Sequence, residues 1–256
     1  MMSSEFDLPL LLFVISVAIL WLAGWFGSTV LRRNRRADGE SQEDLGVILG
    51  ATLALAGLII GFTFSMAVSR YDQRKNFEEA EANAIGTEYV RADFLPAAEA
   101  ARVRALLNAY LDQRVLFYTT RDRKELQQVN DRTAALQQEL WDAVKTPALA
   151  QPNPIQALVV NGMNDVLNSQ GYTQAAWWNR IPQAAWWLML GIAICCNMLI
   201  GYGMRSSARR PLLLLVMPFV LSLAFLLIAD IDTPRAGFVH VVPQNLLALK
   251  PSMKGP

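Results

Sequence analysis

Histidine and cysteine are almost absent from this chain of 256 residues, which has one histidine, His240, and two cysteines, Cys195 and Cys196. The cysteines are adjacent inside an apolar stretch, where neither a disulfide framework nor a thiolate metal site is expected. A single imidazole without a cysteine pair or carboxylate cluster is a poor metal ligand or base. The chain also has no nucleophile and base arrangement and no phosphate-cradling loop. These absences argue against an enzyme and predict neither a metal site nor a cofactor.

Charged residues are scarce as well. They make up 18% of the chain, and the net charge is +1 at pH 7. No basic domain stands out, so the charge pattern does not indicate nucleic-acid binding. Hydrophobic residues make up 53%, and the mean hydropathy of +0.25 is too high for an ordinary soluble domain. The composition predicts an integral membrane protein with a sizeable part in water.

Four apolar runs are long enough to cross a hydrocarbon core of about 30 Å as helices. The residues before the first run carry two acids and no base, so we expect a retained helix rather than a cleaved signal. The fold class predicted is an all-α membrane protein with two hairpins of spans and a helical aqueous domain between them. The spans are 8–31, 45–69, 183–204 and 211–229, within hairpins 1–69 and 183–230, with the domain at 70–182 and a C-terminal tail at 231–256.

The second run has no residue that would end its helix at the membrane surface, because no proline follows before Pro96. We therefore expect it to continue into the aqueous domain, where further amphipathic helices begin near Ala97, Asp122 and Ile155. Gly171 is interpreted as the C-terminal cap of the last of these. Four carboxylates on the extension are interpreted as its solvated face, namely Glu78, Glu79, Glu81 and Glu88.

Small residues recur every four positions along the second run. Such a row allows another helix to approach closely in lipid, and it consists of Gly57, Gly61, Ser65 and Ser69. Beside it lies an apolar stripe of increasing size, Ala54, Leu58 and Phe62. From spacing alone both features fit the interior packing of a helix bundle, and the stripe also fits a pore lining.

Two motifs carry a resemblance to a known family. GFTFSMAVSRYDQR at 61–74 is similar to the glycine-phenylalanine, small polar, arginine-aromatic run of the bestrophin ion channels, and DIDTPRAG at 230–237 is similar to the turn after their last span. The arrangement of two spans, a domain and two spans resembles bacterial membrane proteins grouped as a bestrophin-like domain. The matching motif residues include Arg70, Tyr71, Asp230, Asp232, Pro234 and Gly237.

The resemblance implies a homo-oligomer, of five copies in bestrophins, around an axial pore for small inorganic anions in a bacterial inner membrane. It places the neck of that pore at Ala54, Leu58 and Phe62. Ala54 is smaller than a neck residue should be, and Asp72 stands where a second aromatic is usual. The acidic calcium-binding run expected after the last span is absent, since 238–242 reads FVHVV, so calcium gating is not predicted.

Two arguments on topology disagree. The short loops 32–44 and 205–210 hold seven bases in all, four plus three, and the N-terminus holds none. The positive-inside rule therefore places both loops in the cytoplasm and the domain outside, whereas the resemblance implies the reverse. The charge rule is the one adopted here.

The functional hypothesis is a bestrophin-like oligomeric channel for anions, with a pore lined by the second membrane helix. Its rival is a membrane-anchored helical scaffold or signalling module that binds a protein partner through mixed-charge helices and needs no polar path through the bilayer. Both hypotheses require the lipid bilayer. An enzyme ranks third.

Overall fold

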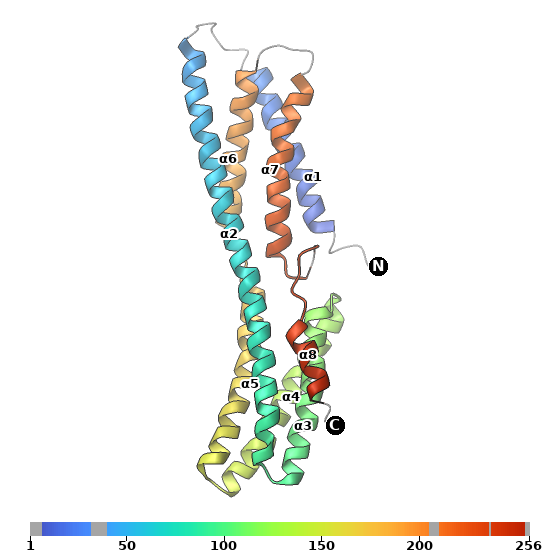
Figure 1. The fold of residues 1–256 in the computed structure, drawn as a ribbon. Coiled ribbons are helices and arrows are strands. Elements are labelled where there is room, and N and C mark those ends of the chain that lie inside the picture. Colours follow the sequence, from blue (N-terminus) through green and yellow to red (C-terminus); the bar gives the residue numbers. More distant parts are fainter. Residues whose placement is uncertain (1–6, 32–39, 205–209, 236, 254–256) are drawn as a thin grey trace. The chain divides into compact units, whose positions relative to one another are not determined.

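The computed structural model describes residues 7–31, 40–204, 210–235 and 237–253. Within these ranges every regular element is a helix and no strand occurs (Figure 1). Four helical stretches are long and apolar enough to cross a membrane, one of them combining two successive α-helices, and each overlaps one of the predicted spans. The all-helical prediction and the presence of four candidate spans are therefore confirmed for the described residues.

The described residues form eight α-helices and two short helical turns. A π-helical turn, η1 (Gly27–Leu31), extends α1, and a 3-10 turn, η2 (Ala92–Phe94), follows α2. The α-helices are α1 (Asp7–Phe26), α2 (Glu40–Arg91), α3 (Ala97–Thr119), α4 (Arg123–Ala150), α5 (Pro154–Trp178), α6 (Gln183–Gly203), α7 (Arg210–Asp232) and α8 (Gln244–Ser252).

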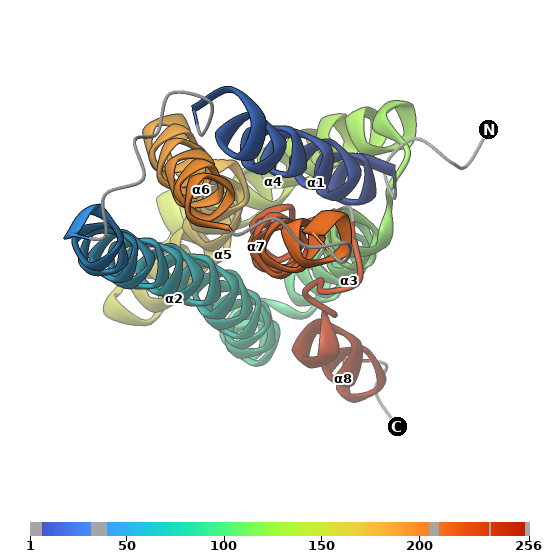
Figure 2. The ribbon, with the colours of Figure 1, turned by 90° about the horizontal axis from the view of Figure 1, so that it is seen from above.

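The chain packs as two compact units, a first unit of residues 1–70 with 180–240 and a second unit of residues 71–179 with 241–256. In the first unit, α1, α6 and α7 lie side by side (Figures 1 and 2). Their contacts bury apolar side chains such as Leu20 of α1, Met189 of α6 and Ile228 of α7. A bundle of three apolar helices therefore forms the core of this unit.

Glycines bring α6 against the end of α1. A Cβ atom on Gly201 would overlap the carbonyl oxygen of Gly24, and one on Gly27 would overlap the carbonyl oxygen of Met198. Only glycine lets the two backbones approach this closely. Within one copy of the chain, close glycine packing in the first unit thus involves these positions and not Gly57 or Gly61 of α2.

In the second unit, the C-terminal part of α2 packs with α3, α4, α5 and α8. Its core consists of buried apolar residues from every helix, including Ile85, Leu107, Leu111, Leu136, Leu140, Val159, Met163 and Leu246. Fully burying one such side chain stabilises a fold by about 1.5 to 3 kcal/mol. The rings of Phe117, Tyr118 and Trp177 pack edge to face beside this core, with centroids 5.0 to 5.5 Å apart.

Side-chain caps define where the helices of the second unit begin. The carboxylate of Asp122 accepts hydrogen bonds from the backbone N–H groups of Lys124 and Glu125, and the amide oxygen of Asn153 caps α5 in the same way. The expected cap at Gly171 is wrong, because α5 continues through it to Trp178. Gly171 faces open space, and a single glycine within a helix of 25 residues costs only about 1 kcal/mol.

Residues after 240, which the sequence suggests are a tail, form α8 on the surface of α3. The carboxylate of Glu78 accepts hydrogen bonds from the backbone N–H groups of Asn245 and Leu246, both at 2.9 Å, and so caps the start of α8. The Tyr89 hydroxyl donates to the carbonyl oxygen of Met253 at the other end. Both ends of α8 are thereby fixed to α2.

Candidate pore-lining helix and buried polar network

The membrane part of α2 is the least buried of the four candidate spans, with 6% of its most apolar window inside the structure. The residues of the predicted stripe are all exposed on one copy of the chain: Leu58 is 51% exposed, Phe62 is 63% exposed, and Ala54 is also exposed. An apolar surface of this kind on a membrane helix contacts either lipid or another protein surface.

The row of small residues lies on the same open side of α2. Gly57, Gly61, Ser65 and Ser69 are all exposed, and a Cβ atom on either glycine would meet nothing within 4 Å. The opposite side of this segment is buried at Ala56, Thr63 and Ala67. The row is therefore free to contact a second copy of the chain, and it does not serve the packing of a single copy.

The turn after α7 is built around two buried carboxylates. Asp230 accepts hydrogen bonds from the backbone N–H groups of Phe238 and Val239, both at 2.8 Å. Gly237 has a φ of +96°, and a Cβ atom there would overlap the Asp230 carboxylate, so glycine is required on both counts. Pro234 is buried within the turn. The motif thus folds the chain back onto the end of α7.

Asp232 of the same motif accepts a hydrogen bond from the backbone N–H of Ile181 at 3.1 Å, just before α6 begins. The carboxylate therefore ties the end of α7 to the entry of α6 within the first unit. Arg70 and Tyr71, the other motif residues, lie at the end of the apolar part of α2. Arg70 is half-buried, and Tyr71 packs against the core of the second unit.

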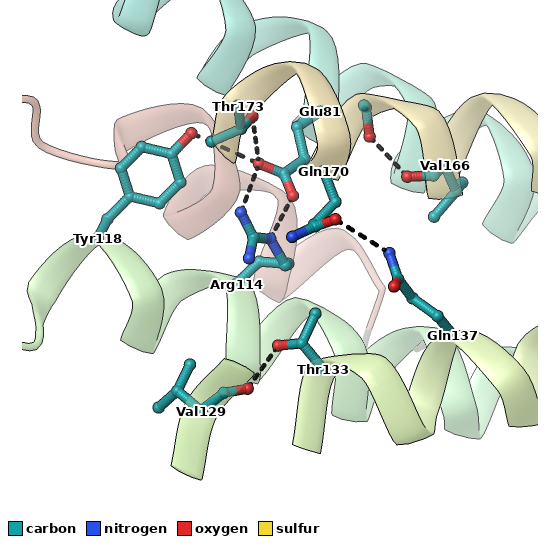
Figure 3. Close-up of polar contacts among 10 residues, drawn as sticks. Glu81, Arg114, Tyr118, Val129, Thr133, Gln137, Val166, Gln170 and Thr173 are labelled. Atoms are coloured by element: carbon teal, nitrogen blue, oxygen red, sulfur yellow. Dashed lines mark hydrogen bonds and ion pairs between the residues drawn. The ribbon is translucent and has the colours of Figure 1, made fainter. Parts of the chain in front are cut away.

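Figure 3 shows a buried polar network that the sequence interpretation missed. The guanidinium of Arg114 on α3 donates to both carboxylate oxygens of Glu81 on α2, and neither side chain is exposed. The hydroxyl groups of Tyr118 and Thr173 donate to the same carboxylate, at 3.4 and 3.1 Å. One carboxylate therefore links α2, α3 and α5 in the interior of the second unit.

Electrostatics in this network follow from its burial. Burial alone would lower the pKa of Arg114, but the Glu81 carboxylate together with Tyr110 and Tyr118 outweighs this effect and raises the pKa, so the guanidinium stays charged. Burial and the same carboxylate both raise the pKa of the Tyr118 hydroxyl, which stays a neutral donor. The network is therefore a fixed structural connection between three helices.

The expectation that the carboxylates of α2 form a solvated face is wrong for three of the four. Glu78, Glu81 and Glu88 are at most 1% exposed, and only Glu79 faces solvent. Their spacing could have shown this, because the three lie in register with the apolar residues Ile85 and Ala92 at intervals of three or four. Buried positions from the membrane part to the end of α2 are Ala56, Thr63, Ala67, Arg74, Glu78, Glu81, Ala82, Ile85 and Glu88.

Among the residues that the structure describes, no three histidine, cysteine, aspartate or glutamate side chains lie close enough to hold a metal ion. Arg74, also buried, donates to the carbonyl oxygens of Ala176 and Asn179 at the end of α5. Such a donor satisfies the free carbonyls of a helix end. The polar interior of the second unit thus consists of helix connections rather than a reaction centre.

These features define an all-helical membrane protein with four candidate spans and one long helix whose membrane part is open on one side. The model of the bestrophin-like domain family matches residues 14–246, and the chain belongs to this family. No curated protein matches the chain.

Solved structures show the same fold. A bacterial bestrophin homologue from Klebsiella pneumoniae shares 14% identity and a TM-score of 0.63, covering 94% of this chain and 98% of its own. A mutant of a bacterial bestrophin homologue from the same organism shares 13% identity and a TM-score of 0.63, covering 99% of this chain and 96% of its own. A crystal structure described as that of a membrane protein shares 14% identity and a TM-score of 0.62, covering 94% of this chain and 98% of its own. At these identities the likeness concerns the fold.

Proposed function

We propose that the protein is an oligomeric ion channel that conducts anions through a pore lined by α2, with a constriction at Ala54, Leu58 and Phe62. One observation carries the proposal: the membrane part of α2 presents both the apolar stripe and the glycine row to open space in a single copy. Several copies that pack through the row would bring the neighbouring stripes towards a common axis.

The size of the exposed stripe supports an apolar gate. Leu58 and Phe62 are large and uncharged, and a ring of such side chains can close a pore by excluding water. Conductance would then depend on the size and polarity of these side chains rather than on local charge. The chain belongs to the bestrophin-like domain family, and its resemblance to the bestrophin ion channels favours this account over lipid exposure alone.

The proposal places residues 70–182 in water, between the two hairpins of spans, in a bacterial inner membrane. Packing within the second unit supports an even number of crossings after this domain, because α8 lies on α3 and must return to the same side of the membrane. The side of the membrane on which the domain lies is inferred from the basic residues of loops 32–44 and 205–210 by the positive-inside rule. Residues 32–39 and 205–209 of these loops lie outside the described residues.

The proposal is tested by ion flux from liposomes that contain the purified protein. Leu58→Ser and Phe62→Ser replace large apolar groups with a small polar one, so each should increase chloride flux several-fold over the wild type. Potassium flux in the same liposomes reports the selectivity.

The matched control is Leu223→Ser on α7. Leu223 is 50% exposed, nearly the same as Leu58, but it lies on another helix, so its replacement should leave the flux unchanged. Wild type and both serine variants that assemble yet remain silent would contradict the channel. That result would favour the scaffold, which needs no conduction.

A further inference from the structure

Glu88 has the least satisfied buried carboxyl group among the described residues. Its side chain lies on α2 in the second unit, beyond the apolar part of the helix, and is 0% exposed. Neither carboxyl oxygen has a hydrogen-bond partner, in contrast to Glu78 and Glu81, which each accept several. An ionised carboxylate without partners is far more costly to bury than a neutral carboxyl.

The site is a close contact between α2 and α5. A Cβ atom on Gly162 of α5 would overlap both the Oε2 atom of Glu88 and the guanidinium of Arg91, so the two side chains occupy the space left by this glycine. Arg91 Nη1 lies 4.0 Å from Oε2, which is too far for a hydrogen bond, and its side chain is 30% exposed. The nearest cation therefore compensates the carboxylate only weakly.

The surrounding charges act in opposite directions. Burial raises the pKa of Glu88 from its ordinary value of 4.5 to about 8, Arg91 on the same helix lowers it, and Asp165 on α5 raises it. Among the described residues these two are the charged groups that act on Glu88. The carboxyl is therefore neutral at pH 7 and releases its proton to solvent only in mildly alkaline conditions.

We propose that Glu88 is a proton-binding site that holds α2 against Gly162 of α5 while it is protonated and loosens this contact when the proton is lost. The carboxylate formed would be fully buried with its nearest cation, Arg91, 4.0 Å away, so it favours an arrangement in which water or a guanidinium comes closer. This assignment concerns the second unit and does not depend on ion conduction.

The direction of the stability change follows from proton linkage. The folded state keeps a proton on Glu88 that the unfolded state loses near pH 4.5, so folding is progressively weakened from that pH up to about pH 8 and is level above it. The melting temperature of the full chain in detergent should therefore fall by several degrees between pH 5 and pH 9. Glu88→Gln, which stays neutral, should remove most of this fall.

A direct readout is the infrared C=O stretch of protonated carboxyl groups, recorded as the pH is raised. Wild type should show a band that disappears near pH 8 and is missing in Glu88→Gln. Glu79→Gln, an exposed glutamate of the same helix, should leave the band and the melting profile unchanged. If the wild-type spectrum in this region is the same as that of Glu88→Gln throughout the titration, the proposal is overturned.

Two neighbouring variants keep the test decisive if Glu88→Gln folds poorly. Asp165→Asn removes a like charge and should move the midpoint of the titration to lower pH, whereas Arg91→Gln removes the cation and should move it to higher pH. A purely structural role for Glu88 would produce no such opposite shifts. Midpoints that stay the same in both variants would also overturn the assignment.

Discussion

Arg114 shows how much the second unit depends on a single buried charge pair. Arg114→Leu leaves the Glu81 carboxylate buried without its cation, so the free energy of unfolding should fall by about 3 to 5 kcal/mol. Denaturant unfolding of the full chain in detergent measures the loss. Replacing both partners by leucine should cost less than this single change, because no unpaired charge then remains.

The control for this prediction is an exposed ion pair on α4. Arg132 and Glu139 lie 3.1 Å apart with about half of each side chain in solvent, so Arg132→Leu should cost less than about 1 kcal/mol. If Arg114→Leu costs no more than Arg132→Leu, the buried pair does not stabilise the unit in the way described.

Two glycines of α5 should respond in opposite ways to alanine. Gly162→Ala introduces a Cβ atom into the space of Glu88 and Arg91, so the melting temperature should fall. Gly171→Ala meets nothing within 4 Å and should stabilise the helix by up to about 1 kcal/mol. Thermal unfolding of the two variants side by side measures this, and a gain in stability for Gly162→Ala would contradict the close contact.

At the scale of elements, α2 is the helix whose two halves have different environments. Its membrane part is exposed on the side of the glycine row, while its second part is buried along a stripe that includes charged residues. A helix that is buried in one unit and open in the other can serve as an assembly surface without loss of its own packing.

Gly61→Leu tests this assembly surface. The leucine fills space that a second helix would occupy, so we expect the oligomer to dissociate or shrink in native mass spectrometry. Gly191→Leu on α6 is the matched control, since Gly191 also faces open space on a membrane helix but lies outside the row. A strictly monomeric wild type would contradict the assembly surface itself.

Helices and spans were predictable because they depend on local patterns. Apolar runs indicate membrane crossings, and caps such as Asp122 follow from side-chain chemistry close in sequence. The end of α5 was not predictable, because packing of Thr173, Ala176 and Trp177 stabilises the helix beyond Gly171. The buried glutamates were missed because a carboxylate is ordinarily solvated, and their partners Arg114 and Asn245 lie 33 and 167 residues away.

At the scale of the whole molecule, the sequence predicts which residues form the candidate site but not how they are arranged in an assembly. Spacing and family resemblance select Ala54, Leu58 and Phe62, and the structure adds that these residues are exposed on one copy. A pore is a property of several copies around an axis, so neither the sequence nor one chain contains its radius, its number of copies or its selectivity. Those properties need a measurement on the assembled protein.

The most direct measurement asks whether position 58 faces water inside a conducting assembly. Leu58→Cys, in a background with Cys195 and Cys196 replaced by alanine, is reconstituted in liposomes and treated with a charged, membrane-impermeant thiol reagent while chloride flux is recorded. We predict that the reagent labels this cysteine and changes the flux several-fold, whereas Leu223→Cys in the same background is unaffected. Chloride flux that is absent, or that persists without labelling or change at position 58, would contradict a pore lined by α2.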